Sequence, residues 1–156
     1  MIELKLKEGD KAPDFKVKDQ DGNTVALKEL RGKNVVIYFY PKDDTATCTV
    51  QSCNLRDNIG VLKKKGIEVF GVSVDDEKSH QHFIKKFSLP FPLLADTDHK
   101  MVDAYGVWGE KNTFGHVHMG IHRTTFLINE EGKIDHILQK IDAENHAQQI
   151  METWGI

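Results

Sequence analysis

The sequence predicts an α/β fold, in which a central mixed β-sheet has helices on both faces and is preceded by an N-terminal hairpin. Two apolar, β-branched runs, at residues 34–40 and 67–74, are typical of strands buried on both faces. Each is followed by apolar positions at helical spacing, which favours strands joined by helices. Two further strand-like runs, separated by a short turn near the C-terminus, add an antiparallel pair and make the sheet mixed.

Bulk composition indicates one ordinary globular domain spanning residues 1–156. The chain is 39% hydrophobic and 29% charged, and it contains no internal repeat, low-complexity tract or linker-like segment. Its net charge of −3 gives no broad attraction to nucleic acid or to an anionic membrane, so neither partner is expected. Residues 1–10 lack the apolar core of a signal peptide, which favours the cytoplasm.

The first half of the chain alternates strands and helices. Residues 15–27 form a hairpin around the turn at 19–23, and residues 34–40 form the central strand. The next helix begins near Cys48 and ends at Gly66, with its apolar positions at Val50, Leu55, Ile59 and Leu62. After the strand at 67–74, Asp75 or Asp76 caps a helix that turns Phe83, Ile84 and Phe87 inward.

The second half begins with short elements. A strand at 93–95 and a brief helix capped by Asp96 or Thr97 precede residues 107–122, which show no clear periodicity and predict a functional or mobile loop. Residues 123–128 and 133–138 then form a hairpin across 129–132. The last helix follows Asp142 and buries Ala147, Ile150, Met151 and Trp154.

The loop after the central strand delivers a cysteine to the start of a helix. Pro41 ends the strand because it has no N–H for a sheet ladder, and the residues after it favour turns and N-caps. Cys48 then falls in the first helical turn, where free N–H groups and the helix dipole stabilise a reactive thiolate. The alternative is that Cys48 and Cys53 are both small buried apolar residues.

Several segments together resemble a known family. Pro41, Thr45 and Cys48 have the P-x-x-x-T-x-x-C spacing of peroxiredoxins, and Cys53 stands at the resolving-cysteine position of the Q-type, or bacterioferritin-comigratory, subgroup. The segments APDF, VIYFYPKD, CTVQSCNLRDN, YGVWGEK and GIHRTTFLI resemble that subgroup in the same order, and they cover nearly the whole chain. The resemblance implies a thioredoxin-like fold.

The resemblance also implies a thiol peroxidase that reduces hydrogen peroxide and organic hydroperoxides. Cys48 would be the peroxidatic residue and Cys53 the resolving one, giving an intramolecular disulfide recycled by thioredoxin or a similar dithiol. Thr45 and Arg123 would stabilise the oxyanion that leaves, which suits the chemistry of their donors, and Pro41 would shield the cysteine. The family implies no metal or haem cofactor, and a monomer.

Two departures from the common family pattern concern the loop and the arginine. Many relatives have Pro-Gly where this chain has Ala46-Thr47, and Glu is frequent where Gln51 stands. Neither change removes a reacting group. Loop flexibility and the hydrogen bonding around Arg123 are the properties that these changes affect.

The spacing of the cysteines predicts a conformational change. If Cys48 and Cys53 share one helix, their Cα atoms lie on the order of 8.6 Å apart. A disulfide tolerates no more than about 7 Å. The first turns of the helix must therefore unwind when the two cysteines join.

Other roles for the same residues stay open at this stage. Thr45 could serve only as an N-cap, Pro41 only as a strand terminator, and Arg123 as one half of a surface ion pair. Three aromatic residues on or beside a buried strand could line a substrate pocket: Tyr38, Tyr40 and Trp108. Such residues are more often part of the core.

Other functions also compete. A metal site could be built from His116, His118 and His122, although their spacing matches no standard zinc motif. A disulfide reductase would normally carry C-x-x-C, whereas four residues separate these cysteines. A noncatalytic redox sensor would use the same disulfide chemistry.

Overall fold

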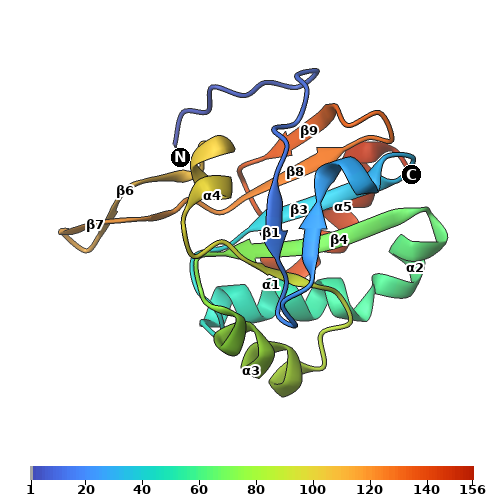
Figure 1. Ribbon diagram of the computed structural model, residues 1–156. Helices are drawn as coiled ribbons and strands as arrows, with labels where there is room; N and C mark the ends of the chain where they lie inside the picture. The colour runs from blue at the N-terminus through green and yellow to red at the C-terminus, as the bar shows by residue number, and fades with distance from the viewer. Residues whose placement is uncertain (1) are drawn as a thin grey trace.

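A five-stranded mixed sheet forms the centre of the computed structural model, which describes residues 2–156 (Figure 1). Its strand order is β5-β4-β3-β8-β9, and two separate hairpins, β1–β2 and β6–β7, lie outside it. The strands are β1 (Lys16–Lys18), β2 (Thr24–Ala26), β3 (Asn34–Phe39), β4 (Ile67–Ser73), β5 (Leu93–Ala95), β6 (Trp108–Thr113), β7 (His116–Ile121), β8 (Thr124–Ile128) and β9 (Ile134–Leu138). The helices are η1 (Leu27–Leu30), α1 (Ala46–Asp57), α2 (Ile59–Lys64), α3 (Glu77–Phe87), α4 (Lys100–Ala104), η2 (Ala143–Asn145) and α5 (His146–Trp154).

Strand β3 is the middle of the sheet and carries the loop that leads to Cys48. It pairs in parallel with β4 and antiparallel with β8, and β4 pairs in parallel with β5. Its apolar, β-branched sequence suits a position with neighbours on both edges and both faces. The predicted mixed sheet is therefore confirmed.

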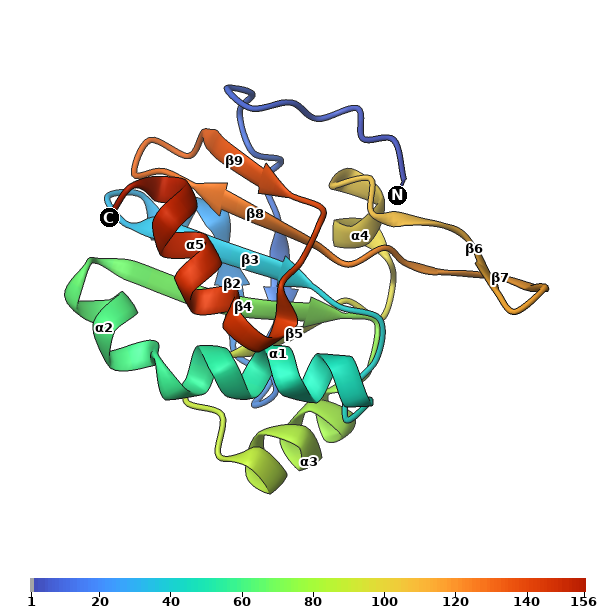
Figure 2. The same cartoon turned by 180° about the vertical axis from the view of Figure 1, so that it is seen from behind.

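Alternate residues of β3 enter two different cores. Val35, Ile37 and Phe39 pack on the face covered by α4 and the β1–β2 hairpin. Val36 and Tyr38 pack on the opposite face, where α1 and α5 lie across the sheet (Figure 2). Helices thus cover both faces, as predicted, although short elements cover one of them.

The helix predicted from Cys48 to Gly66 is instead two helices, because the chain breaks at Asn58. Asn58 has φ −112° and ψ 8°, and its side-chain amide donates to the carbonyl of Asn54. Such local side-chain bonds compete with helix continuation. Val50, predicted to face the core, is 42% exposed, whereas Leu55 and Leu62 are buried as expected.

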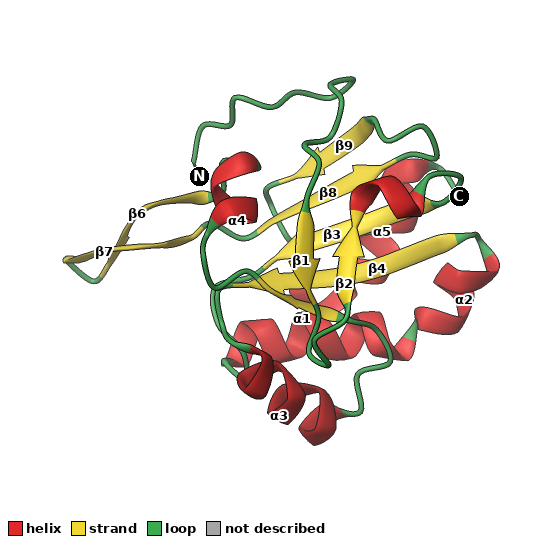
Figure 3. Ribbon diagram, viewed as in Figure 1, coloured by secondary structure: helices red, strands yellow, loops and turns green. Residues whose placement is uncertain are grey.

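The prediction of a loop at 107–122 was wrong: this stretch is a regular two-stranded ribbon that projects from the body (Figure 3). Its turn uses Phe114 and Gly115, both at positive φ, which suits a tight hairpin. Much of the ribbon is exposed on both faces, so its sequence lacks the alternation by which strands are recognised.

The remaining predicted elements are confirmed with small shifts of their ends. Asp76 caps α3 by accepting a hydrogen bond from the amide of Ser79, and Asp96 accepts from the amides of Met101 and Val102 at the start of α4. Among residues 2–156, no helix has both the length and the apolar character needed to span a membrane.

Candidate functional site

Cys48 lies in the first turn of α1, as predicted, and its thiol is buried against a guanidinium group. The residue is 1% exposed, and Nη2 of Arg123 donates to its Sγ at 3.1 Å. The helix begins at Ala46, so Cys48 is among the residues whose backbone N–H groups have no partner within the helix. The thiol therefore lies beside both the positive end of the helix dipole and a permanently charged guanidinium.

Arg123 reaches Cys48 because it directly precedes β8, beside the end of β3. Phe39 pairs with Thr124, which brings the start of one strand next to the end of the other. Nη1 of Arg123 donates to Oε1 of Gln51 at 2.7 Å, and within residues 2–156 the arginine forms no ion pair with an acidic side chain. The interpretation of Arg123 as one half of a surface ion pair is therefore wrong.

Gln51 is the neutral residue that orients this arginine. It is fully buried, and its Nε2 has no hydrogen-bond partner among the described residues. A glutamate there would compensate the charge of Arg123, whereas the amide leaves that charge available to Cys48. A glutamate at position 51 would thus alter the electrostatics of the site, whereas Gln51 keeps a neutral acceptor for the arginine.

A second cation lies at the base of the β6–β7 ribbon. Nζ of Lys111 donates to the carbonyl of Ile121 at 2.9 Å. Burial lowers the pKa of Lys111, the positive charge of Arg123 lowers it further, and Cys48 acts in the opposite direction. The ribbon therefore contributes to the electrostatic field around the thiol.

Thr45 and Pro41 lie on the loop before α1. Thr45 is the N-cap residue by position, but its hydroxyl makes no capping bond and donates instead to the carbonyl of Lys42 at 2.9 Å. The alternative in which Thr45 serves only as a side-chain N-cap is therefore wrong, although the residue does occupy the N-cap position. Thr45 is exposed and Pro41 is half-buried, whereas Cys48 beside them is buried.

Cys53 lies farther along the same helix and is half-buried, and both cysteines are free thiols. The helical path between them corresponds to a Cα separation on the order of 8.6 Å. A bond between the two sulfurs therefore requires α1 to change shape.

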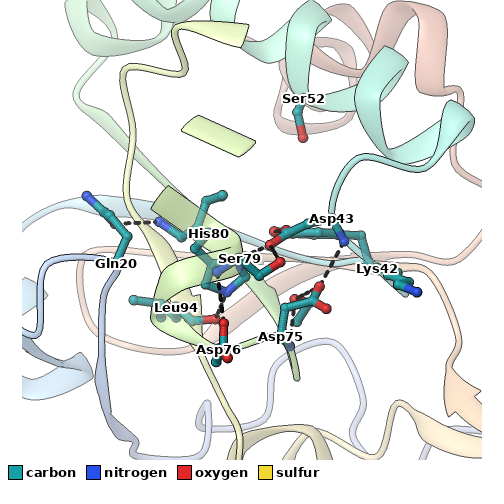
Figure 4. Close-up of polar contacts among 12 residues, drawn as sticks. Gln20, Lys42, Asp43, Ser52, Asp75, Asp76, Ser79, His80 and Leu94 are labelled. Carbon is teal, nitrogen blue, oxygen red and sulfur yellow. Dashed lines mark hydrogen bonds and ion pairs between the residues drawn. The ribbon is translucent and has the colours of Figure 1, made fainter. Parts of the chain in front are cut away.

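A buried polar network holds the loop between β3 and α1 (Figure 4). The carboxylate of Asp43 accepts from the Tyr40 hydroxyl at 2.5 Å and from the Ser79 hydroxyl at 2.8 Å, and it meets Nδ1 of His80 at 2.7 Å. Nε2 of His80 donates to the carbonyl of Leu94, since a carbonyl oxygen can only accept. The loop is thereby joined to α3 and β5.

Asp75 extends this network from the end of β4. Its Oδ2 accepts from the amide of Asp43 at 2.8 Å and from the hydroxyl of Ser73 at 2.8 Å. Asp43, Asp75 and His80 are close enough to share one ion. Both carboxylate oxygens of Asp43, both ring nitrogens of His80 and Oδ2 of Asp75 are already engaged in hydrogen bonds within the protein, so the cluster fits a structural role.

The three histidines considered for a metal site do not converge. His116 and His118 stack on β7 with ring centroids 5.6 Å apart, whereas Nε2 of His122 meets the carbonyl of Glu110. Tyr38 and Tyr40 are core residues with no exposed surface, which fits the commoner role predicted for such aromatic residues.

Two groups of residues around the site were not recognised from the sequence. The sequence predicts Asp43 only as a turn residue and indicates no role for His80 within its helix. Their contact joins positions 37 apart, and no local pattern signals it. Asn54, which follows Cys53, likewise bonds to a segment that the sequence does not place beside it.

Comparison with known proteins agrees with this geometry. Residues 8–137 match the family model described as "AhpC/TSA family". The chain is 48% identical over 141 residues to "Peroxiredoxin Bcp" of Escherichia coli (strain K12), and the match covers 90% of each chain. It is 41% identical over 145 residues to "Peroxiredoxin Bcp" of Bacillus subtilis (strain 168), and that match covers 93% of this chain and 92% of the relative. The solved structure of the Xanthomonas campestris bacterioferritin comigratory protein superposes with a TM-score of 0.88 at 31% identity, covering 96% of this chain and 97% of that chain.

Proposed function

The chain belongs to the AhpC/TSA family and is a thiol-dependent peroxidase of the Bcp kind of peroxiredoxin, and from this premise we propose that Cys48 is its peroxidatic residue. The observation that supports this assignment is the 3.1 Å hydrogen bond from Arg123 to the buried Sγ of Cys48, at the start of a helix. No acidic side chain among residues 2–156 pairs with that guanidinium, so its charge favours the thiolate.

In the first step, the Cys48 thiolate attacks the terminal oxygen of a hydroperoxide, and the O–O bond breaks. The sulfur becomes a sulfenic acid, and the departing oxygen carries negative charge until it takes a proton as water or an alcohol. Arg123 stabilises that charge through its fixed N–H donors. Thr45 contributes a hydroxyl after it leaves the Lys42 carbonyl, and Pro41 limits access of water.

In the second step, the thiol of Cys53 attacks the sulfenic sulfur. A disulfide forms between Cys48 and Cys53 and water leaves, which requires the first turns of α1 to unwind. A dithiol such as thioredoxin then reduces the disulfide by exchange.

The substrate class is hydrogen peroxide together with organic hydroperoxides. Alkyl peroxide reduction is the activity ascribed to the Xanthomonas campestris protein, which supports the organic substrates for this chain. The unit of function is the single domain of residues 1–156, acting in the cytoplasm as a monomer without a metal or haem cofactor.

The test is a free-thiol titration with intact mass measurement, before and after one equivalent of hydrogen peroxide. Loss of both thiols with a decrease of about 2 Da is expected on disulfide formation. Cys48→Ser should abolish turnover, and Cys53→Ser should give one turnover and accumulate sulfenic acid, then sulfinic acid. Survival of both thiols in the parent protein, or full turnover by Cys48→Ser, would reject the assignment.

A further inference from the structure

Asn54 joins the helix of the two cysteines to the C-terminal helix. Its Nδ2 donates to the carbonyl of Glu144 at 2.9 Å and to Oε1 of Gln148 at 3.3 Å, and its Oδ1 accepts from the amide of Ala147 at 2.8 Å. Ala147 lies in the first turn of α5, where the amides lack partners within the helix. The side chain of Asn54 thus caps a helix from 93 positions away.

Neighbouring residues hold the same part of α1. Nη1 of Arg56 donates to the carbonyl of Phe87 at 2.7 Å, and Nε2 of Gln148 donates to Oδ1 of Asn58. The C-terminal half of α1 is therefore bonded both to the end of α3 and to α5. Figure 2 shows α5 lying beside α1 on this face of the sheet.

The N-terminal half of α1 is held differently. Ala46, Thr47 and Val50 are exposed, and no side chain caps the first turn. Its contacts with the rest of the protein are buried ones, from Cys48 and Gln51 to Arg123, and from Ser52 to the Tyr38 hydroxyl.

Oxidation weakens one bond of the N-terminal set, the hydrogen bond from Arg123 to Cys48. A hydrogen bond from a guanidinium to a thiolate gains strength from both charges, and a sulfenic acid at Cys48 is uncharged when protonated. The bonds of Asn54 are to neutral groups on α5 and η2 and do not change with the redox state of Cys48. Unwinding should therefore begin at Ala46 and stop before Asn54.

We propose that Asn54 is a positioning residue for the second step of the reaction, and that it fixes Cys53 in place while the segment that carries Cys48 unwinds toward it. The inference rests on the proposed function, because it concerns formation of the Cys48–Cys53 disulfide. The Cys53 thiol supplies the sulfur and the proton, the sulfenic S–O bond breaks, and the oxygen leaves as water. No other reactant enters this step.

The test compares Asn54→Ala with Gln149→Ala, a control that removes side-chain hydrogen bonds within the C-terminal segment and none to α1. Gln149 bonds to the amide of Asp142, to His146 and to the carbonyl of Lys140, all within the C-terminal segment. Each reduced protein is mixed with one equivalent of hydrogen peroxide and quenched at intervals. Mass spectrometry then separates sulfenic acid from disulfide, which gives the rates of the first and second steps.

We expect Asn54→Ala to slow disulfide formation roughly tenfold, because a mobile Cys53 loses its fixed approach to the sulfenic sulfur. The first step should keep the parent rate, and Gln149→Ala should keep both rates. Excess peroxide should convert more of the Asn54→Ala protein to sulfinic acid, because slower resolution leaves the sulfenic acid exposed for longer. Disulfide formation at the parent rate or faster would overturn the proposal.

Hydrogen exchange of the oxidised proteins gives a second measurement. The parent should lose protection of the amides of residues 46–57, whose helical acceptors lie at or before residue 53, and keep it at Asn58, whose amide donates to the carbonyl of Leu55. Asn54→Ala should lose both. Loss of protection at Asn58 as well in the oxidised parent would contradict the proposal. If Asn54→Ala fails to fold, Asn54→Asp keeps the acceptor for Ala147 and should slow the second step less. Failure of the parent to form the disulfide would instead reject the proposed function, and this inference with it.

Discussion

Removing the carboxylate of Asp43 should destabilise the protein far more than changing its exposed neighbour Asp44. Asp43→Ala leaves the Tyr40 hydroxyl, the Ser79 hydroxyl and Nδ1 of His80 without their shared hydrogen-bond partner. The His80 and Asp43 side chains are 0% and 4% exposed, so water does not replace the lost bonds without rearrangement.

The magnitude follows from the number of groups left unpaired. Each buried donor without a partner costs about 1–3 kcal/mol, and partial relaxation lowers the sum. We therefore expect a loss of about 3–5 kcal/mol in the free energy of unfolding. This loss is a large share of the stability of an ordinary domain.

The assay is urea unfolding of the reduced protein, with Asp44→Asn as the matched control. The carboxylate of Asp44 pairs with Lys86 in an ion pair whose side chains are 43% and 59% exposed. Such a pair contributes about 0–1 kcal/mol, and asparagine tolerates the positive φ of 57° at this position. A loss for Asp43→Ala that matched the control would refute the reasoning.

The same variant should also slow the reaction with peroxide. The loop that Asp43 holds runs directly into the first turn of α1, so its release disturbs the position of Cys48 against Arg123. The rate of Cys48 oxidation is measured by stopped flow in Asp43→Ala and in Asp44→Asn. Both variants lose one negative charge, so a slower reaction in Asp43→Ala alone reports the release of the loop.

Three further predictions concern pH, packing and the guanidinium. Burial lowers the pKa of His146 to about 4 from 6.5, so the neutral histidine stabilises the fold above pH 6.5, and this stability is lost as the pH falls to about 4. Urea denaturation at several pH values should therefore show that His146→Gln removes up to about 3 kcal/mol of this pH-dependent change in unfolding free energy. Gly71→Ala would place Cβ 2.6 Å from Leu93 and 2.8 Å from Tyr38, and should lower the unfolding free energy by about 1–3 kcal/mol in urea. Arg123→Lys keeps one charge but loses the paired N–H donors, and should slow stopped-flow Cys48 oxidation on the order of 100-fold; an unchanged rate would exclude a role for the guanidinium geometry.

Local chemistry in the sequence was enough to predict most of the fold. The buried strands β3 and β4 and the helix start at Cys48 depend on residues close together in the chain, such as Pro41 and the β-branched runs before it. The family motif also singled out Arg123, whose contact with Cys48 joins positions 75 apart. Composition alone would not have predicted that Arg123 contacts Cys48.

Other features depended on contacts that no local pattern records. The β6–β7 ribbon escaped recognition because exposure on both faces removes the alternation of polar and apolar residues. The break at Asn58 arises from one side-chain bond, and the network of Asp43 and His80 depends on how α3 packs. Register and tertiary packing, rather than propensity, decide such features.

The position of both cysteines on α1 has a consequence for how activity responds to dilution. Under the proposed pairing, each sulfenic acid meets a thiol of its own chain, and the effective concentration of that thiol is set by the length of the linking segment. The rate of disulfide formation per chain should therefore stay constant as the protein is diluted. A peroxidase that resolves through a cysteine on another subunit would lose this step once its subunits separated.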